Sequence, residues 1–218
     1  IREYLAYKPL LFDGGMGTYY KAVPGAECEL ANLTDPEGVK RVHAEYLAAG
    51  AQAIKSNTFG LPRMAAAQMP GWEELAEAGW KLACDAAAEK DAAVFADLGP
   101  APDTEAAPAS SAYGLAAQQF AALGAKNFLF ETLSSDVGVV EAVKALRVAV
   151  PDAFVMVSFA VLPDGYTREG LLFRDLLRRM EGSGVVDAVG LNCVSAPGAM
   201  KKLVQGLGET RLPLSVMP

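Results

Sequence analysis

The stretch Asn127-Phe-Leu-Phe-Glu-Thr132 contains the pattern that decides the fold. An apolar run of strand length ends there in a carboxylate and a hydroxyl group, and an amphipathic stretch, Val137–Val148, follows a few residues later. The next run, Phe154–Val161, is almost wholly apolar instead of alternating, which is typical of parallel strands that are covered on both faces. Together these segments predict a strand–helix–strand unit with parallel strands.

The same unit recurs along the chain, with strand-like runs that begin roughly 34 residues apart, the size of one strand–helix repeat. The predicted strands are Leu10–Asp13, Ala53–Phe59, Ala93–Leu98, Asn127–Thr132, Phe154–Val161, Asp187–Cys193 and Leu212–Met217. The predicted helices are residues 34–50, Trp72–Glu89, Tyr113–Leu123, Val137–Val148, Leu171–Met180 and Gly198–Leu207. Thr34 is expected to cap the first helix and Gly50 to end it. Two architectures fit this order: an open doubly wound sheet, or a barrel of eight units.

Polar residues at the strand ends favour the barrel. They follow almost every apolar run, as Asp13, Ser56 to Thr58, Asp97, Glu131, Ser158 and Asn192. In a barrel all strand ends meet at one mouth, whereas an open sheet concentrates its site at one switch point. We therefore expect an α/β fold, a (β/α)8 TIM barrel, with residues 1–218 as a single barrel domain whose eighth βα unit is absent from the chain.

Composition limits the class of protein. The 218 residues carry a net charge of −7, and 52% of them are hydrophobic, which excludes global disorder. An acidic chain without a basic cluster argues against nucleic acid and anionic membranes as partners, and no apolar run reaches the roughly 18 residues of a membrane span. Three cysteines far apart in sequence argue against a disulfide scaffold and indicate a reducing compartment, so we expect a cytoplasmic protein.

Taken one at a time, the candidate site residues leave alternatives open. Three glycines follow Asp13 within four positions and let the backbone approach a ligand, but a tight turn explains them as well, and the spacing fits neither the dinucleotide nor the P-loop pattern. Glu131 could hold a substrate ammonium, or it could pair with a lysine or arginine of the protein itself.

The cysteines and the single histidine are also ambiguous alone. Cys193 ends a strand, where a cysteine is more often a small apolar residue than a ligand. His43 lies within a predicted helix and is expected at its surface or in an interface, so Cys–His nucleophilic catalysis is not expected. Cys28 and Cys84 show no ligand spacing, and we expect both to be structural.

In combination, seven short motifs occur in one order over nearly the whole chain. They are Asp13-Gly-Gly-Met-Gly-Thr18, Asn32-Leu-Thr34, Ser56-Asn-Thr-Phe59, Asp97-Leu-Gly-Pro100, Phe130-Glu-Thr132, Val157-Ser-Phe159 and Gly190-Leu-Asn-Cys193. This set resembles the homocysteine S-methyltransferase family, the barrel found in cobalamin-dependent methionine synthase and in betaine- and S-methylmethionine-dependent relatives.

The resemblance implies transfer of a methyl group to the sulfur of homocysteine, which gives methionine. It also implies a zinc ion that is held by three cysteine thiolates and takes the substrate sulfur as its fourth ligand. Cys193 matches the first zinc cysteine of the family. Glu131 and Asp13 match positions that face the ammonium, the loop at Gly14 and Gly15 would face the carboxylate, and Asn57 would shape the pocket.

The chain departs from the family at the other two zinc ligands, an adjacent Cys-Cys pair on the eighth strand. It contains no such pair. Two explanations compete: the 218 residues belong to a longer chain that carries the pair, or the chain has lost the pair and its catalysis. The alternative to a methyltransferase is then a non-catalytic barrel that binds an amino acid or a partner.

Two further expectations concern the reaction class and the methyl donor. A barrel lyase or aldolase would need a strand-end lysine for Schiff-base chemistry, and Lys55 is the candidate. The opening segment Ile1–Leu5 resembles the type that uses methylcobalamin charged from methyltetrahydrofolate. We therefore expect a cobalamin- or folate-binding domain in the same chain or in another.

Overall fold

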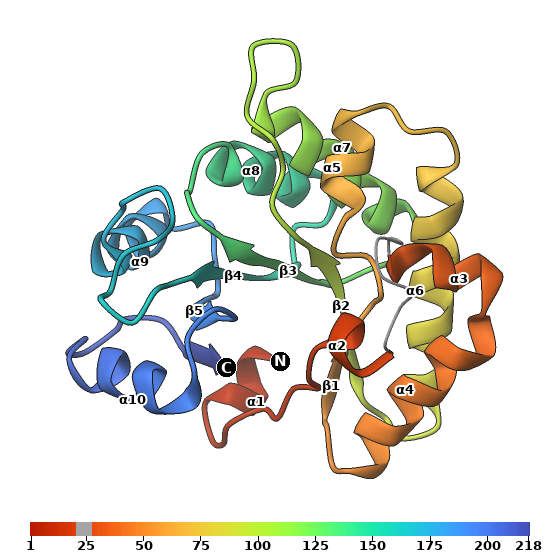
Figure 1. The fold of residues 1–218 in the computed structure, drawn as a ribbon, viewed down its shortest axis with the longest axis horizontal. Coiled ribbons are helices and arrows are strands. Elements are labelled where there is room, and N and C mark those ends of the chain that lie inside the picture. Colours follow the sequence, from red (N-terminus) through yellow and green to blue (C-terminus); the bar gives the residue numbers. More distant parts are fainter. Residues whose placement is uncertain (21–27) are drawn as a thin grey trace.

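A parallel sheet that curls into a half-barrel forms the centre of the fold in the computed structural model, which describes residues 1–20 and 28–218 (Figure 1). The described residues form six strands that pair in sequential order. They are β1 (Ala53–Lys55), β2 (Ala93–Leu98), β3 (Asn127–Leu133), β4 (Phe154–Ala160), β5 (Ala188–Asn192) and β6 (Leu214–Met217). Sequential order with the long helices around the outside is the arrangement of a barrel, and it rules out the doubly wound alternative.

The helices differ in how well the sequence predicted them. They are α1 (Arg2–Leu5), α2 (Met16–Tyr20), α3 (Ala31–Thr34), α4 (Pro36–Ala48), α5 (Leu61–Ala66), α6 (Trp72–Ala88), α7 (Ala109–Ala122), α8 (Val139–Ala149), α9 (Phe173–Ser183) and α10 (Pro197–Gln205), with a 3-10 turn at Cys28–Leu30. The six long helices were all predicted, whereas the four short ones span too few turns to show a periodic pattern. None of the described helices combines the length and the apolar character that crossing a membrane requires.

Two predicted strands are wrong in part. Leu10–Asp13 does not form a strand, because only Phe12 makes a single parallel bridge, to Ala53. The strand predicted over Ala53–Phe59 ends at Lys55, and the chain then turns, with the Thr58 N–H donating to the Ser56 carbonyl. The described residues thus form a half-barrel and not the complete eight-unit barrel.

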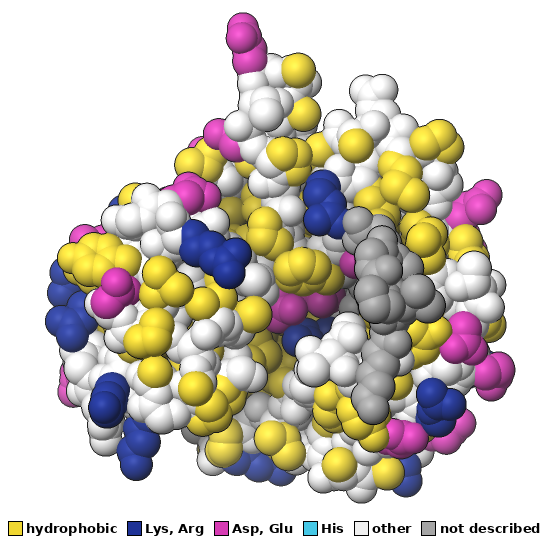
Figure 2. All heavy atoms as spheres, in the orientation of Figure 1, with side chains coloured by type: hydrophobic (Ala, Val, Ile, Leu, Met, Phe, Trp, Pro, Cys, Tyr) yellow, Lys and Arg dark blue, Asp and Glu magenta, His cyan; other side chains and the backbone are white. Residues whose placement is uncertain are grey.

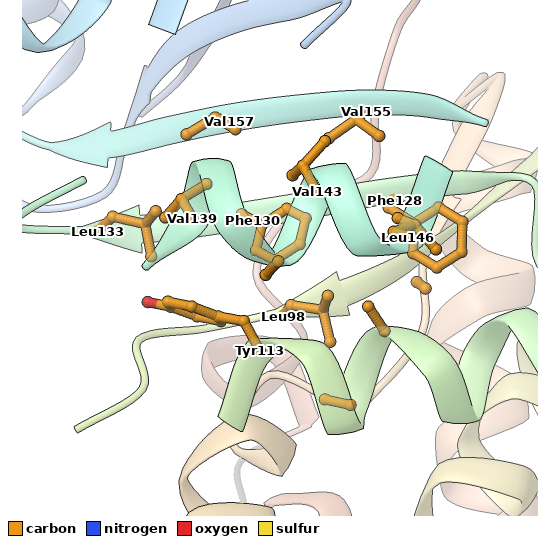
Figure 3. Close-up of a cluster of buried hydrophobic side chains, with 14 of the residues drawn as sticks. Leu98, Tyr113, Phe128, Phe130, Leu133, Val139, Val143, Leu146, Val155 and Val157 are labelled. Carbon is orange, nitrogen blue, oxygen red and sulfur yellow. The ribbon is translucent and has the colours of Figure 1, made fainter. Parts of the chain in front are cut away.

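Burial on both faces explains why the strands look uniformly apolar. In β3, Phe128 and Phe130 point outward and pack with α7 and α8, as Figure 3 shows, while Leu129 points to the inside. The inner apolar layer comprises Ala53, Phe95, Leu129, Phe154, Met156 and Ala188. Because side chains alternate along a strand, the two layers use alternate residues of the same runs.

The same alternation directs the strand-end polar residues inward. Two residues after Phe95 in β2 comes Asp97, and two residues after Leu129 in β3 comes Glu131. Lys55 holds the same position two residues after Ala53. These three side chains therefore lie above the inner apolar layer, at the carboxyl ends of neighbouring strands.

An ion-pair network fastens the opposite end of the sheet. Asp187, just before β5, accepts hydrogen bonds from Arg2 Nε at 2.7 Å, Arg147 Nη2 at 2.8 Å and the Val155 N–H at 2.8 Å. Arg2 lies in α1, whose neighbours Ile1 and Leu5 pack against the inner apolar layer. The network thereby holds the first helix at the open side of the half-barrel.

The residue that caps the start of α4 differs from the predicted one. Asp35, not Thr34, is the N-cap residue, because its Oδ1 accepts the Gly38 N–H at 3.1 Å. Thr34 instead ends the short helix α3 and donates its hydroxyl to the Leu30 carbonyl. Pro36 occupies the first turn as predicted, and Gly50 follows the helix with a φ of +106°.

His43 is a second correction, because it is fully buried and not at a surface. Neither ring nitrogen has a hydrogen-bond partner among the described residues. Burial lowers the pKa of His43 to about 4, from an ordinary value of 6.5. The folded state therefore holds the neutral imidazole, and protonation favours unfolding.

We predict that His43→Leu removes an acid-sensitive component of stability. The unfolded chain protonates this histidine below about pH 6.5, so wild type loses free energy of unfolding as the pH falls from 6.5 to 4, by about 3 kcal/mol in total. Urea unfolding at several pH values should show the variant gaining on wild type over this window. Since the chain has one histidine, parallel profiles would contradict this assignment.

Candidate functional site

A cavity of about 1540 Å³ lies inside the half-barrel and opens at the carboxyl ends of the strands. Figure 2 shows a hollow at the centre of this face, with acidic and basic side chains at its floor. The cavity is lined by every site residue that the sequence predicted, Asp13, Gly14, Gly15, Asn57, Glu131 and Cys193. The expected convergence on one mouth is therefore found.

Four ionisable side chains meet at the floor of this cavity, those of Asp13, Lys55, Asp97 and Glu131. The sequence analysis had named Lys55 only as the candidate for the aldolase alternative. Lys55 Nζ lies 3.4 Å from Glu131 Oε1 and 3.3 Å from Oε2. The backbone N–H of Lys55 donates to Asp13 Oδ2 at 3.0 Å. The sequence analysis left two interpretations of Glu131 open, and in this structure Glu131 pairs with a lysine of the protein itself.

Burial shapes the protonation of this cluster. It raises the pKa of Asp13 to about 7, although the charge of Lys55 and its N–H act in the opposite direction. Burial, followed by the charge of Glu131, also raises the pKa of Asp97 well above its ordinary value. Neither Asp13 Oδ1 nor Asp97 Oδ1 has a hydrogen-bond partner within the described part of the chain. The cluster therefore has more carboxyl groups than cations to pair with them.

The acidic neighbours of Lys55 stabilise its charged form. Burial alone would lower its pKa, but the charges of Glu131, Asp97 and Asp13 outweigh burial and raise the pKa above the ordinary value for lysine. A lysine that forms a Schiff base needs its amine deprotonated near neutral pH. Lys55 stays a cation here, which disfavours the aldolase alternative.

Asn192, which the sequence analysis named among the strand-end polar residues but not among the ligand-binding residues, connects the ends of β3 and β5. Its Nδ2 donates to Thr132 Oγ1 at 2.7 Å and to Glu131 Oε2 at 3.4 Å, and its Oδ1 accepts the Thr132 N–H at 2.9 Å. The signal that could have identified it is its position beside Cys193 at a strand end, facing inward by alternation. Asn192 therefore fixes the orientation of Glu131 from a strand two positions away.

Backbone strain is concentrated at the same strand ends. Thr132, Cys193 and Val194 have φ values of +60°, +58° and +57°, which are uncommon for residues other than glycine. Val194 is β-branched, and such residues avoid this region most strongly. Strain of this kind persists where the surrounding structure enforces it, often at functional sites.

Close packing against Tyr46 explains why the loop after Asp13 contains glycine at position 14. A Cβ atom on Gly14 would lie 2.5 Å from Tyr46 Oη and 2.9 Å from the ring, so only glycine allows this approach. Tyr46 Oη in turn donates to the Gly15 carbonyl at 3.4 Å. The loop is thereby held against α4 beside Asp13.

Asn57 has a structural role within the cavity wall. Its Nδ2 donates to the Cys28 carbonyl and to Asn32 Oδ1, each at 2.9 Å, and Asn32 Nδ2 donates back to the Asn57 carbonyl. Glu29, which the sequence analysis did not select, accepts the Gly60 N–H from the same segment. These bonds fasten the 3-10 turn to the loop after β1 and so shape the mouth.

A zinc site of three thiolates requires the three cysteine side chains to lie close together. Within residues 1–20 and 28–218, no group of three or more His, Cys, Asp or Glu side chains is placed to hold a metal ion. Cys193 is exposed, and Cys28 lines the same cavity, but burial and then Glu29 raise the pKa of Cys28 to about 11. Cys84 lies on α6 and is not among the residues that line the cavity. The described residues therefore do not fit a zinc site of three thiolates.

We predict that Asn192→Ala lowers the free energy of unfolding by about 2 kcal/mol, because it leaves the buried partners of the amide unsatisfied. Urea unfolding measures the effect. The matched control is Ser134→Ala, which removes one accessible hydrogen bond to Glu169 and should change stability by less than about 0.5 kcal/mol. Equal effects of the two substitutions would show that Asn192 does not fix this edge of the site.

Comparison with known proteins gives a consistent family. The homocysteine S-methyltransferase family matches residues 10–218. Methionine synthase of Mycobacterium tuberculosis is 30% identical over 244 residues, and that of Mycobacterium leprae 28% over 245 residues, each alignment covering 99% of this chain. The chain spans 20% of the length of these two relatives.

Solved structures agree with the fold. The metallated form of homocysteine methyltransferase MmuM from Escherichia coli superposes with a TM-score of 0.77 at 24% identity, covering 99% of this chain and 85% of that one. Its apo form gives a TM-score of 0.72 at 27% identity, covering 95% and 80%. The fold of this chain thus matches the corresponding part of these solved structures.

Proposed function

Because the chain belongs to the homocysteine S-methyltransferase family, we propose that it methylates the sulfur of homocysteine to form methionine. The observation that carries the proposal is the shared cavity, which joins a cluster of buried carboxyl groups at its floor to Cys193. Homocysteine carries an ammonium at one end, which would pair with the carboxyl groups, and a thiol at the other end, which would lie on the side of Cys193. We further propose that residues 1–218 act as one barrel domain.

The floor of the cavity suits the amino-acid end of the ligand. Asp13, Asp97 and Glu131 surround one lysine, so a ligand that brings a positive charge is favoured over a neutral or anionic one. The glycine loop at Gly14 and Gly15 borders the same floor and is proposed to face the carboxylate of the ligand. Holding both ends of homocysteine orients its sulfur, which lowers the entropic part of the reaction barrier.

Activation of the sulfur is the step that these residues leave incomplete. A free alkyl thiol is mostly protonated at neutral pH, and the thiolate is the nucleophile. A zinc ion would supply that ionisation. We propose Cys193 as one zinc ligand, and two further thiolates would have to come from residues other than these 218, because the described donor set does not fit the ion.

For the methyl donor we propose methylcobalamin charged from methyltetrahydrofolate, bound by another domain or chain. The resemblance of residues Ile1–Leu5 supports this choice of donor, and the name of the two mycobacterial relatives, methionine synthase, supports methionine as the product. The second candidate function is a non-catalytic barrel that binds an amino acid, and the incomplete set of thiolates favours it.

Zinc content separates these two functions. We predict that the 218-residue chain binds zinc substoichiometrically, whereas a full-length protein that supplies two further thiolates binds about one ion per chain. Metal analysis after dialysis measures both. A full-length protein that binds homocysteine but no zinc would be the non-catalytic barrel.

We predict that Glu131→Ala weakens homocysteine binding by about 10-fold or more, since it removes the carboxylate that pairs with Lys55 at the floor of the cavity. Titration calorimetry of the full-length protein measures the affinity. The control is Glu141→Ala on the exposed face of α8, which should leave affinity unchanged. Unchanged affinity in Glu131→Ala would remove this residue from the site.

A further inference from the structure

The pairing of Lys55 with Glu131 changes which carboxylate is open to a ligand, if the proposed function holds. Both side chains are buried, with 12% and 8% of their surfaces exposed. Lys55 Nζ lies against both oxygens of Glu131, and Asn192 Nδ2 donates to Oε2 as well. Glu131 is thus already paired with a cation and an amide of the protein itself.

Asp13, in contrast to Glu131, has one carboxylate oxygen without a partner among the described residues. Its Oδ2 accepts the Lys55 N–H, but its Oδ1 has no hydrogen-bond partner among the described residues. The residue is 8% exposed and lines the cavity. A buried acceptor without a donor is costly, and a ligand ammonium would satisfy it with a charged hydrogen bond.

We propose that Lys55 is a specificity-determining residue: it occupies Glu131 as a resident cation, so that Asp13 holds the ammonium of the amino-acid ligand. Glu131 is then a positioning residue that acts through Lys55. When Glu131 cannot hold Lys55, the lysine turns toward the remaining carboxylate of Asp13 and competes with the ligand.

The balance of charge supports this assignment. Lys55 and Glu131 cancel each other in charge, and burial, followed by the charge of Glu131, raises the pKa of Asp97 well above its ordinary value. Burial raises the pKa of Asp13 to about 7, so below that pH an arriving ammonium favours the ionised carboxylate and displaces its proton to the solvent. A ligand carboxylate at Lys55 would instead meet three acidic side chains.

A double-mutant cycle on the full-length protein tests the proposal through homocysteine affinity. We expect Glu131→Gln to weaken binding by about 10-fold or more, and Lys55→Met with Glu131→Gln to restore affinity to within about 3-fold of wild type. Asp13→Asn should weaken binding by about 10- to 100-fold. It should also abolish the preference for homocysteine over 4-sulfanylbutanoate, which lacks the ammonium, whereas the double variant should keep that preference.

A second measurement needs no variant. Methionine has the same amino-acid end and no ionisable thiol, so its binding to wild type should release up to about one proton at pH 6 and almost none at pH 8.5. Calorimetry in buffers of different ionisation enthalpy counts these protons. Circular dichroism checks that each variant is folded.

The outcomes separate the two proposals. If the folded double variant binds as weakly as Glu131→Gln, the role of Lys55 is overturned while homocysteine binding stands. If methionine releases no proton at pH 6, the assignment of the ligand ammonium to Asp13 is overturned. If wild type binds neither homocysteine nor methionine, the proposed function and this inference fail together.

Discussion

Burial of the sheet on both faces is the constraint on which the rest of this structure depends. Each strand sends alternate side chains to the helices outside and to the space inside, so a polar residue at a strand end has no solvent-exposed face to turn to. Lys55 and Glu131 consequently meet inside the half-barrel, where isolated charges would be costly. The site arises because the same alternation that builds the core brings ionisable groups together above it.

That constraint also explains what could be predicted from the sequence. Apolar runs of strand length located β2 to β6 closely, and their polar ends identified residues that do line one cavity. Leu10–Asp13 failed as a strand although it is equally apolar, because a strand needs continuous pairing and only Phe12 pairs. His43 was misplaced because a single polar residue in an amphipathic helix is assigned to the solvent by default, whereas α4 buries it.

The contacts between the side chains of the site could not be predicted from the sequence, for a geometric reason. Lys55 and Glu131 lie on β1 and β3, which pair with β2 and not with each other, so no local spacing brings them together. Asn192 likewise reaches β3 from β5, across β4. Such contacts depend on the curvature of the sheet, which shortens distances across the inside of a half-barrel.

The two halves of the proposed reaction differ in how far this chain supports them. Recognition of an amino acid needs charges and open acceptors, and the cavity floor contains them in a buried, hydrogen-bonded arrangement. Activation of a thiol needs several thiolates at one point, and Cys193 alone is a single strained, exposed residue at the rim. The excess of carboxyl groups around one lysine is relieved either by protonation, as the raised pKa values of Asp13 and Asp97 indicate, or by another cation. The strongest physical argument for a cationic ligand is therefore the imbalance of this cluster, and it holds whether or not a metal completes the site.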